Sequence, residues 1–401
     1  MVSFSMSVIG NLSPLLFITF RSLYGFSYSL LGLLVLINFV TQLSIDLVFS
    51  FFSHKFNIEK TVKFTPALAL VGFLAYALLP QIIPEAAFLG IAIGTVIFSG
   101  AGGLAEVLIS PVIAAIPSDN PDREMSGLHS IYAWGVVAVI SIGTFFLLIF
   151  DAEQWFLLPL IFCVIPLLAS VLYIGVDIPK IQTPEKVSGA MSFLRSRALY
   201  LCFFAIFLGG AAECTMAQWA SGYIERALGI SKVWGDIFGV AAFAATLGIG
   251  RTLYAKYGKN IERVLLLSAV GATVCYAAAA LSNVAVIGLV ACAFTGFCTA
   301  VMWPGCLVVA SEKFPTSGVF IYAMMAAGGD LGASVGPQLV GMVADFAMSL
   351  QGVQGIALNM GITAEQIGLK LGMLIGGLFP LAAIFVYAAL CRQKRLSLDK
   401  N

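Results

Sequence analysis

Residues 87–116 read AFLGIAIGTVIFSGAGGLAEVLISPVIAAI, an apolar run in which Glu106 is the one charged residue. A helix needs roughly 20 mostly apolar residues to cross the hydrocarbon core of a bilayer, so this run is long enough to span it. A transmembrane strand does not fit, because the run is too long and does not alternate between apolar and polar residues. The stretch therefore predicts a transmembrane helix with a carboxyl group inside it.

The same pattern recurs along the rest of the chain. Of the 401 residues, 60% are hydrophobic and only 10% are charged, whereas a soluble globular chain carries roughly 25% charged residues. So few charges could not cover a water-exposed surface of this size, and the apolar surface must instead face lipid. We therefore predict an all-α integral membrane protein with twelve transmembrane helices, near residues 2–20, 31–52, 64–81, 87–116, 127–150, 155–176, 199–222, 235–254, 264–282, 284–310, 318–347 and 368–391.

The positive charges alternate between the loops of this predicted topology. In membrane proteins Lys and Arg gather on the cytoplasmic side. One side holds Lys55, Lys60, Lys63, Arg123, Lys180, Lys186, Arg195, Arg197, Arg251, Lys256, Lys259, Arg263, Lys313, Arg392, Lys394, Arg395 and Lys400. The other side holds Arg21, Arg226, Lys232 and Lys370. This asymmetry supports the helix count and predicts that both termini are cytoplasmic, in a multi-pass protein of the plasma (inner) membrane.

The longest polar connection lies near the middle of the chain and separates two halves of six predicted helices. The halves resemble each other weakly, because the spacing from Gly103 to Pro111 equals that from Gly296 to Pro304. Two parallel repeats of six helices are typical of carriers with a midplane site between halves that rock for alternating access. We predict two pseudo-symmetric bundles: an N-terminal six-helix bundle over 1–176, a cytoplasmic linker over 177–197 and a C-terminal six-helix bundle over 198–401.

The loop after the second predicted helix and several helical segments carry residues of a known family. The loop has Ser50, His54, Lys55 and Asn57 at fixed positions of the signature G-x-x-x-D-R-x-G-R-x-K, with His54 in place of the aspartate. The other segments are Asn11-Leu-Ser-Pro14, Glu106 with Ser110-Pro111 and Pro117, Leu128-His129-Ser-Ile-Tyr-Ala-Trp134-Gly135, and Glu213-Cys-Thr-Met-Ala-Gln218-Trp219-Ala-Ser-Gly-Tyr223. The chain thus resembles the major facilitator superfamily, and within it the fucose-permease-like sugar:proton symporters. The resemblance implies that Glu106, at the position of a helix-4 glutamate, carries the coupling proton.

Four carboxyl groups fall well inside predicted helices. They belong to Asp46, Glu106, Glu213 and Asp330. Each costs roughly 2.5–3.5 kcal/mol at the centre of a membrane helix, so such residues almost always face the bundle interior or a wet cavity. Asp46 also ends a row with Asn38 and Gln42, four residues apart and therefore on one helix face. The sequence therefore predicts that this face either lines a cavity or gate, or forms an interhelical hydrogen-bond seam.

Proton coupling is the role predicted for Glu106, together with Asp46 and His129. A carboxyl group beside the kink at Pro111 can take up and release a proton while it stays hydrogen-bonded. The alternatives for Glu106 are a substrate hydrogen-bond acceptor and a structural role. His129 can titrate near neutral pH, although a lone histidine is more often structural.

Polar and aromatic side chains within the spans are the predicted substrate contacts. An indole offers a flat apolar face and an N–H donor, which suit the C–H face of a sugar. Glu213 follows Gly209-Gly210, where small residues permit local unwinding. For each residue the alternative is ordinary helix packing. The set comprises Asn11, Asn38, Gln42, Trp134, Glu213, Gln218, Trp219, Thr299, Trp303 and Asp330.

Several classes of function are disfavoured by the sequence. The net charge of +1 gives no argument for nucleic acid as a partner. There is no metal-ligand spacing, P-loop or nucleophile elbow, so we expect neither an enzyme nor a metal or cofactor. No Lys or Arg is predicted near the midplane, and Asp236 and Arg251 are expected at the interfaces. The cavity should therefore disfavour anions.

We therefore expect a monomeric secondary transporter that takes up a small neutral polar solute, a sugar, together with protons. Na⁺ is the alternative coupling ion. One rival is proton-coupled efflux of amphipathic or cationic compounds, which an acidic cavity also favours. The other is a non-transporting receptor or scaffold with a transporter fold. Because the first apolar run begins at Met1 without a polar leader, we also hypothesise that the native start lies upstream.

Overall fold

The computed structural model describes residues 1–52, 55–117, 121–179, 196–314 and 319–398, which form helices and loops without a β-strand among them. Ten of these helical segments are long and apolar enough to cross a membrane, and the bent pair α1 (Val2–Leu15) and α2 (Phe17–Tyr24) adds an eleventh. A shorter apolar helix covers Trp134–Ile149. Together these segments overlap all twelve predicted spans, and the all-α multi-pass membrane architecture is confirmed.

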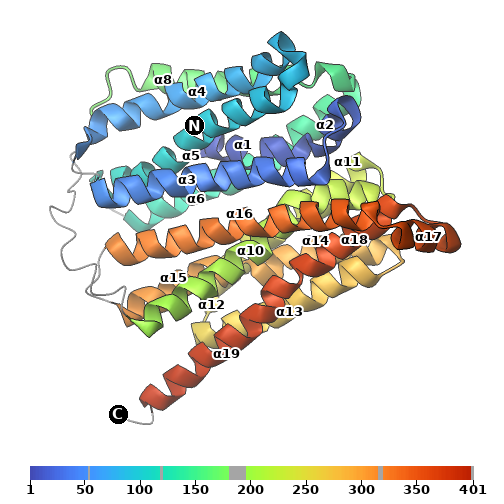
Figure 1. The fold of residues 1–401 in the computed structure, drawn as a ribbon. Helices are drawn as coiled ribbons and strands as arrows, with labels where there is room; N and C mark the ends of the chain where they lie inside the picture. Colours follow the sequence, from blue (N-terminus) through green and yellow to red (C-terminus); the bar gives the residue numbers. More distant parts are fainter. Residues whose placement is uncertain (53–54, 118–120, 180–195, 315–318, 399–401) are drawn as a thin grey trace. The chain divides into compact units, whose positions relative to one another are not determined.

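The described residues divide into two compact units, which share one helix. Unit 1 contains the described residues of 1–25 and 37–188, and unit 2 those of 26–36 and 189–401. Helix α3 (Tyr28–Phe52) therefore begins in unit 2 and ends in unit 1. The other helices of unit 1 are α1, α2, α4 (Ile58–Ile82), α5 (Ala87–Ala115), α6 (Pro121–Ile149), α7 (Leu157–Phe162) and α8 (Val164–Leu172), with 3₁₀ turns at Pro84–Ala86 and Ala152–Gln154 (Figure 1).

Unit 2 contains the two longest described helices, α10 and α16, and one π-helical turn. Its elements are α10 (Arg197–Arg226), α11 (Lys232–Gly235), the π-helical turn Asp236–Ala241, α12 (Ala242–Tyr257), α13 (Ile261–Leu281), α14 (Ala285–Thr299), α15 (Met302–Lys313), α16 (Val319–Ser349), α17 (Gln351–Met360), α18 (Ala364–Gly376) and α19 (Leu378–Leu398). Helix α17 was not among the predicted spans. The predicted span 284–310 is broken between α14 and α15.

Local sequence explains several helix ends. Helix α1 ends just after Pro14, and its axis bends by 44° into α2, as expected where a proline disturbs the helical hydrogen bonds. Asn57 caps α4, because its Oδ1 accepts a hydrogen bond from the backbone N–H of Lys60 at 3.0 Å. His54, of the predicted signature loop, lies outside the described residues.

Helices α4 and α5 pack closely in unit 1 because glycines meet the opposite backbone. A Cβ atom at Gly72 would collide with the main chain of Phe98, and one at Gly94 would collide with the main chain of Tyr76. Small residues allow such approaches between membrane helices. The buried Tyr76 hydroxyl also lies 3.0 Å from the hydroxyl of Ser13 in α1. A hydrogen bond therefore joins a third helix to this pair.

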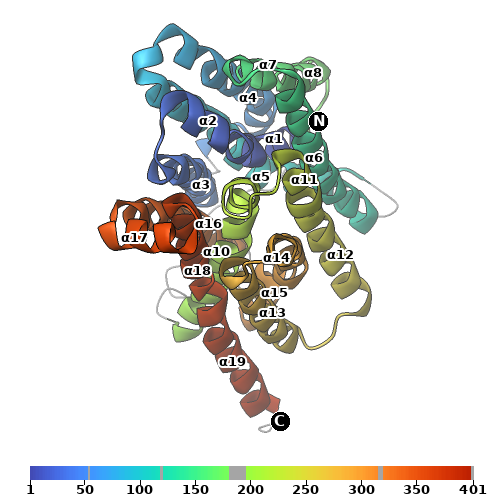
Figure 2. The same cartoon turned by 90° about the vertical axis from the view of Figure 1, so that its right-hand side faces the viewer.

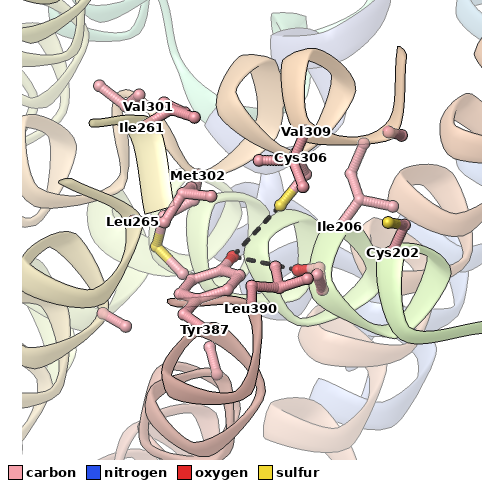
Figure 3. Close-up of a cluster of buried hydrophobic side chains, with 14 of the residues drawn as sticks. Cys202, Ile206, Ile261, Leu265, Val301, Met302, Cys306, Val309, Tyr387 and Leu390 are labelled. Carbon is pink, nitrogen blue, oxygen red and sulfur yellow. Dashed lines mark hydrogen bonds between the residues drawn. The ribbon is translucent and has the colours of Figure 1, made fainter. Parts of the chain in front are cut away.

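The core of unit 2 is held together by apolar contacts and by buried tyrosine hydroxyls. Helix α13 packs against α14 and α15, and α10 contacts α14, α15 and α19 (Figure 2). The hydroxyl of Tyr387 donates to the backbone carbonyl of Ala205 at 3.0 Å and lies 3.7 Å from Cys306 Sγ (Figure 3). Tyr276 likewise donates to the carbonyl of Ala212 at 2.8 Å. Buried hydroxyls need such partners, so these tyrosines cross-link helices.

A carboxylate of unit 2 caps the first turn of α3. Asp345 of α16 accepts hydrogen bonds from the backbone N–H groups of Tyr28 at 3.0 Å and Ser29 at 2.6 Å. The Tyr28 hydroxyl donates to Glu365 Oε1 at 2.7 Å. The first N–H groups of a helix have no partner within the helix, and a negative charge there also complements the helix dipole. Two side chains from other helices therefore fix the start of α3.

We expect Gly94→Ala to destabilise the protein by about 1–3 kcal/mol, because the added methyl group forces α4 and α5 apart. Gly100→Ala is the matched control on the same helix, since its Cβ would meet nothing closer than Leu68 Cδ2 at 3.9 Å. Unfolding of the purified protein in mixed detergent micelles measures both. Equal stability of the two variants would contradict the proposed contact.

Replacement of Asp345 by Ala should lower the free energy of unfolding by about 1 kcal/mol or more, because two backbone N–H groups of α3 lose their acceptor. Asp151→Ala is the control, since Asp151 precedes a 3₁₀ turn but makes no side-chain capping bond. Thermal unfolding in detergent compares the two. A loss no larger than that of the control would show that the cap contributes nothing to stability.

Candidate functional site

A row of polar side chains on α3 faces α5 within unit 1. The Gln42 amide donates to Asn38 Oδ1 at 3.0 Å, and the Ser99 hydroxyl of α5 donates to the same oxygen. Asn38, Gln42 and Asp46 are all buried. The four-residue spacing thus places the row on one face, and at Asn38 this face forms an interhelical hydrogen-bond seam.

Gly102 and Gly103 of α5 bring the helix against this row. A Cβ atom at Gly103 would lie 2.9 Å from Ile45 Cβ and 3.1 Å from Gln42 Cα, so no larger residue fits without displacement. One helical turn beyond Gly103, the close approach of α3 and α5 brings two acidic side chains together. A carboxylate oxygen of Asp46 and one of Glu106 lie within 4.8 Å of each other. Asp46 is 3% exposed, whereas Glu106 is exposed.

The arrangement of this carboxylate pair is suited to holding a proton. Like charges at such a separation repel each other, and the repulsion favours a state in which one carboxyl group is protonated. The hydrocarbon surroundings of a transmembrane span add to the cost of two free charges. Glu106 is the member of the pair that lies at the surface of the unit. This chemistry needs no cofactor.

The other candidates of unit 1 do not join this row by any contact in the described structure. The Asn11 side chain donates to the carbonyl of Ser7 in its own helix at 2.9 Å. Trp134 is 73% exposed. The side chains of His129, Ser110 and Pro111 lie outside the described residues. The roles predicted for Asn11, Trp134 and His129 therefore stay predictions.

In unit 2 the predicted acid of α10 is paired with a cation. Arg251 Nη2 of α12 lies 3.0 Å from Glu213 Oε1, and Arg251 Nε donates to the carbonyl of Ala300 at 3.1 Å. The absence of Lys and Arg near the midplane stays a prediction, but Arg251 does reach an acid of α10. Asp236, expected at an interface, is fully buried and forms an ion pair with Lys232 at 3.1 Å. Long basic side chains reach several ångströms from their backbone, so helix position alone did not fix where these charges end.

Gly209 and Gly210 do not unwind α10, which is continuous from Arg197 to Arg226. The unwinding that these small residues permit is therefore not used, and Gly210 instead makes room for an aromatic ring. A Cβ atom there would lie 3.0 Å from Cζ3 of Trp303, and one at Gly329 would lie 2.5 Å from its Cη2. The indole of Trp303 is thus seated between α10 and α16. Asp330 follows Gly329 in α16 and is buried.

The remaining candidates of unit 2 are buried among helices. The Trp219 indole N–H donates to the carbonyl of Pro337 at 2.9 Å, and its ring centroid lies 5.6 Å from that of Tyr28. The Thr299 hydroxyl donates to the carbonyl of Thr295 at 3.0 Å. Gln218 is 6% exposed. The predicted substrate contacts of these residues stay predictions, and the Trp219 and Thr299 donors already have partners inside the protein.

These features define a multi-pass membrane carrier, with apolar helices in two units and acidic groups held at membrane depth. Residues 1–337 match the Major Facilitator Superfamily, and the chain belongs to this family. The superfamily resemblance seen in the sequence is therefore confirmed. Membership makes the protein a transporter of small solutes and not an enzyme. No curated protein sequence matches the chain significantly.

Solved transporter structures share this fold over nearly the whole chain. A bacterial homologue of the human lysosomal transporter Spinster has a TM-score of 0.72 at 13% identity, covering 98% of this chain and 95% of that one. The nucleoside transporter NupG has a TM-score of 0.72 at 14% identity and 97% coverage of both chains. The E. coli fucose:proton symporter FucP has a TM-score of 0.63 at 15% identity, covering 97% and 96%. At these identities the likeness shows the fold alone.

Proposed function

We propose that this protein moves a small neutral polar solute, a sugar or a related hydroxylated compound, across the membrane together with protons. The observation that carries the proposal is the carboxylate pair of Asp46 and Glu106, whose oxygens lie within 4.8 Å inside a transmembrane unit. A carrier of the superfamily works by alternating access, and coupling requires a group whose charge changes during the cycle. The carboxylate pair supplies such a group.

Glu106 takes the proton first in this mechanism, because it is exposed whereas Asp46 is buried. The proton neutralises the pair and removes the repulsion between the two acids. Binding of the solute then fills the site, and the loaded protein closes the site to one side of the membrane and opens it to the other. Release of the proton on the other side restores the charge, so that the gradient drives net uptake.

A neutral solute fits the charges better than a cation or an anion does. The acids of unit 1 disfavour an anion, and Arg251 already neutralises Glu213 in unit 2. The fucose:proton symporter and the nucleoside transporter that share the fold are named for solutes rich in hydroxyl groups. Efflux of amphipathic cations is the competing function, and it is separated from uptake of a neutral solute by the assay below.

The placement in the cell follows from the positive charges of the loops. Lys and Arg concentrate on the side that carries both termini, so we propose cytoplasmic termini and insertion in the plasma (inner) membrane. The protein acts as a monomer in the bilayer, since one chain supplies both units. H⁺ is the proposed coupling ion, with Na⁺ as the alternative that ion substitution tests.

The substitution Glu106→Gln should abolish proton-driven accumulation while it preserves solute exchange, because the neutral amide mimics a permanently protonated site. Proteoliposomes with an inward proton gradient, tested with L-fucose, D-xylose and uridine, measure accumulation, and counterflow of the same solutes measures exchange. We expect accumulation to fall at least tenfold. A gradient of Na⁺ without a proton gradient should give no uptake.

The control is Glu59→Gln, which removes an exposed acid that pairs with Lys63 at 2.8 Å near the start of α4. This variant should accumulate solute as the native protein does. Unchanged accumulation by Glu106→Gln would remove Glu106 from the coupling role. Export of tetraphenylphosphonium, with no transport of any neutral solute, would replace the proposed function by cation efflux.

A further inference from the structure

A cavity of about 330 Å³ lies at one end of unit 2, where three connections between helices meet. It is lined by residues that follow α10, by the turn between α13 and α14, and by residues from the end of α17 to the second turn of α18. Figure 1 shows α17 and α18 at this end of the unit. The charges of the loops predict that all three connections lie on the side of the membrane away from the termini. The cavity is thus expected at the level of the lipid headgroups.

The polar part of the lining contains a cation whose charge no acid of the lining balances. Lys370 Nζ donates to the carbonyl of Ser282 at 2.8 Å and lies 3.5 Å from Asn283 Oδ1. An ammonium group has three N–H donors, so one of them is left without a protein acceptor among the described residues. None of the described residues that line the cavity is Asp or Glu. The cavity therefore favours a negatively charged ligand.

The capping box of α18 holds a second donor in this lining. Gln366 Oε1 accepts a hydrogen bond from the backbone N–H of Thr363 at 3.0 Å, and the Thr363 hydroxyl accepts one from the backbone N–H of Gln366 at 3.1 Å. These contacts leave both N–H donors of Gln366 Nε2 without a partner in the described structure. Lys370 follows Gln366 by four residues, so the two side chains share one face of α18. A single bound anion can therefore accept from both.

The rest of the lining and the surface around it are apolar. Leu228 and Met360 line the cavity beside the polar groups. Helix α17, which ends at Met360, carries no charged residue and buries only Ala357. Large apolar side chains close to the cavity in sequence are exposed, at 68% for Leu281, 54% for Val284 and 83% for Leu358. An uncharged helix with exposed apolar side chains suits the boundary between headgroups and acyl chains.

We propose that this cavity binds the phosphate of an anionic phospholipid in the leaflet away from the termini. The phosphate accepts hydrogen bonds from Lys370 Nζ and Gln366 Nε2, and the acyl chains lie against the exposed apolar side chains outside the cavity. Ligand pockets have volumes of roughly 300–1,000 Å³. A cavity of about 330 Å³ therefore holds a headgroup and leaves the chains outside. This lipid site goes beyond the proposed solute transport and does not depend on it.

A phospholipid fits this site better than a small soluble anion, because donors and apolar surface occur together. A soluble anion would use only the donors of Lys370 and Gln366. A lipid uses the same donors and also covers the exposed side chains of Leu281 and Leu358 with its acyl chains. Lipids with a net negative charge are favoured over those with a choline headgroup, whose trimethylammonium would bring a second cation toward Lys370.

The test is native mass spectrometry of the full chain, purified in detergent and titrated with phosphatidylglycerol or phosphatidylcholine. We expect the native protein to bind phosphatidylglycerol more tightly than phosphatidylcholine. Lys370→Gln should weaken phosphatidylglycerol binding about tenfold, because the amide can still donate to the carbonyl of Ser282 but carries no charge. Arg21→Gln is the matched control, since it removes a cation predicted on the same side of the membrane but from unit 1. It should leave lipid binding unchanged.

A second variant, Gln366→Glu, separates lipid recognition from folding. Glutamate preserves the capping box and can pair with Lys370 four residues later, so the melting temperature should stay close to that of the native protein. Phosphatidylglycerol binding should still be lost, because the new carboxylate repels the phosphate and occupies the cation. Gln351→Glu adds the same charge at an exposed position of α17 outside the cavity, and it should bind the lipid as the native protein does.

Three results would overturn the lipid site. The first is native affinity for phosphatidylglycerol in either Lys370→Gln or Gln366→Glu. The second is equal binding of the two lipids by the native protein. The third is displacement of phosphatidylglycerol by an equal concentration of glycerol 1-phosphate, which would assign the cavity to a soluble phosphate compound instead.

Discussion

The main constraint on this protein is that every backbone N–H and C=O group at membrane depth must find its partner within the protein. Helices meet this requirement along their length, but not at their ends or breaks. Asp345 meets it at the start of α3, where it accepts two backbone N–H groups. Arg251 meets it at the carbonyl of Ala300, which Pro304 leaves without its helical donor. The charged residues of unit 2 therefore support the backbone before they serve any ligand.

The two units hold their acids in different ways. In unit 1 Asp46 and Glu106 lie together, so their combined charge depends on whether a proton is bound. In unit 2 Glu213 is paired with a cation, since Arg251 Nη2 lies 3.0 Å from its Oε1. On the proposed function, the acids of unit 1 respond to the proton gradient, whereas Glu213 already has its counter-charge within unit 2.

Much of this organisation was predictable from sequence, because length and hydrophobicity determine a membrane span almost without tertiary information. The row of Asn38, Gln42 and Asp46 followed from helical periodicity, and the depth of Glu106 followed from its place in a long apolar run. The partner of Glu213 did not follow, since a flexible arginine near a helix end can reach toward either the interface or the interior. Pro304 was the available signal, as it marks a carbonyl in need of a donor. The role of Gly210 depends on Trp303, which is distant in sequence.

Helix α3 belongs to both units, and this has a mechanical consequence. Its first turns belong to unit 2 and its remainder, which carries Asp46, to unit 1. Between Tyr28 and Phe52 there is no proline, and sharp bends in helices usually need one or an equivalent defect. The helix is therefore a stiff element whose first residues are assigned to one unit and the rest to the other. Its end in unit 2 is anchored to α16 by the two hydrogen bonds that Asp345 accepts, so loss of that carboxylate would release this end.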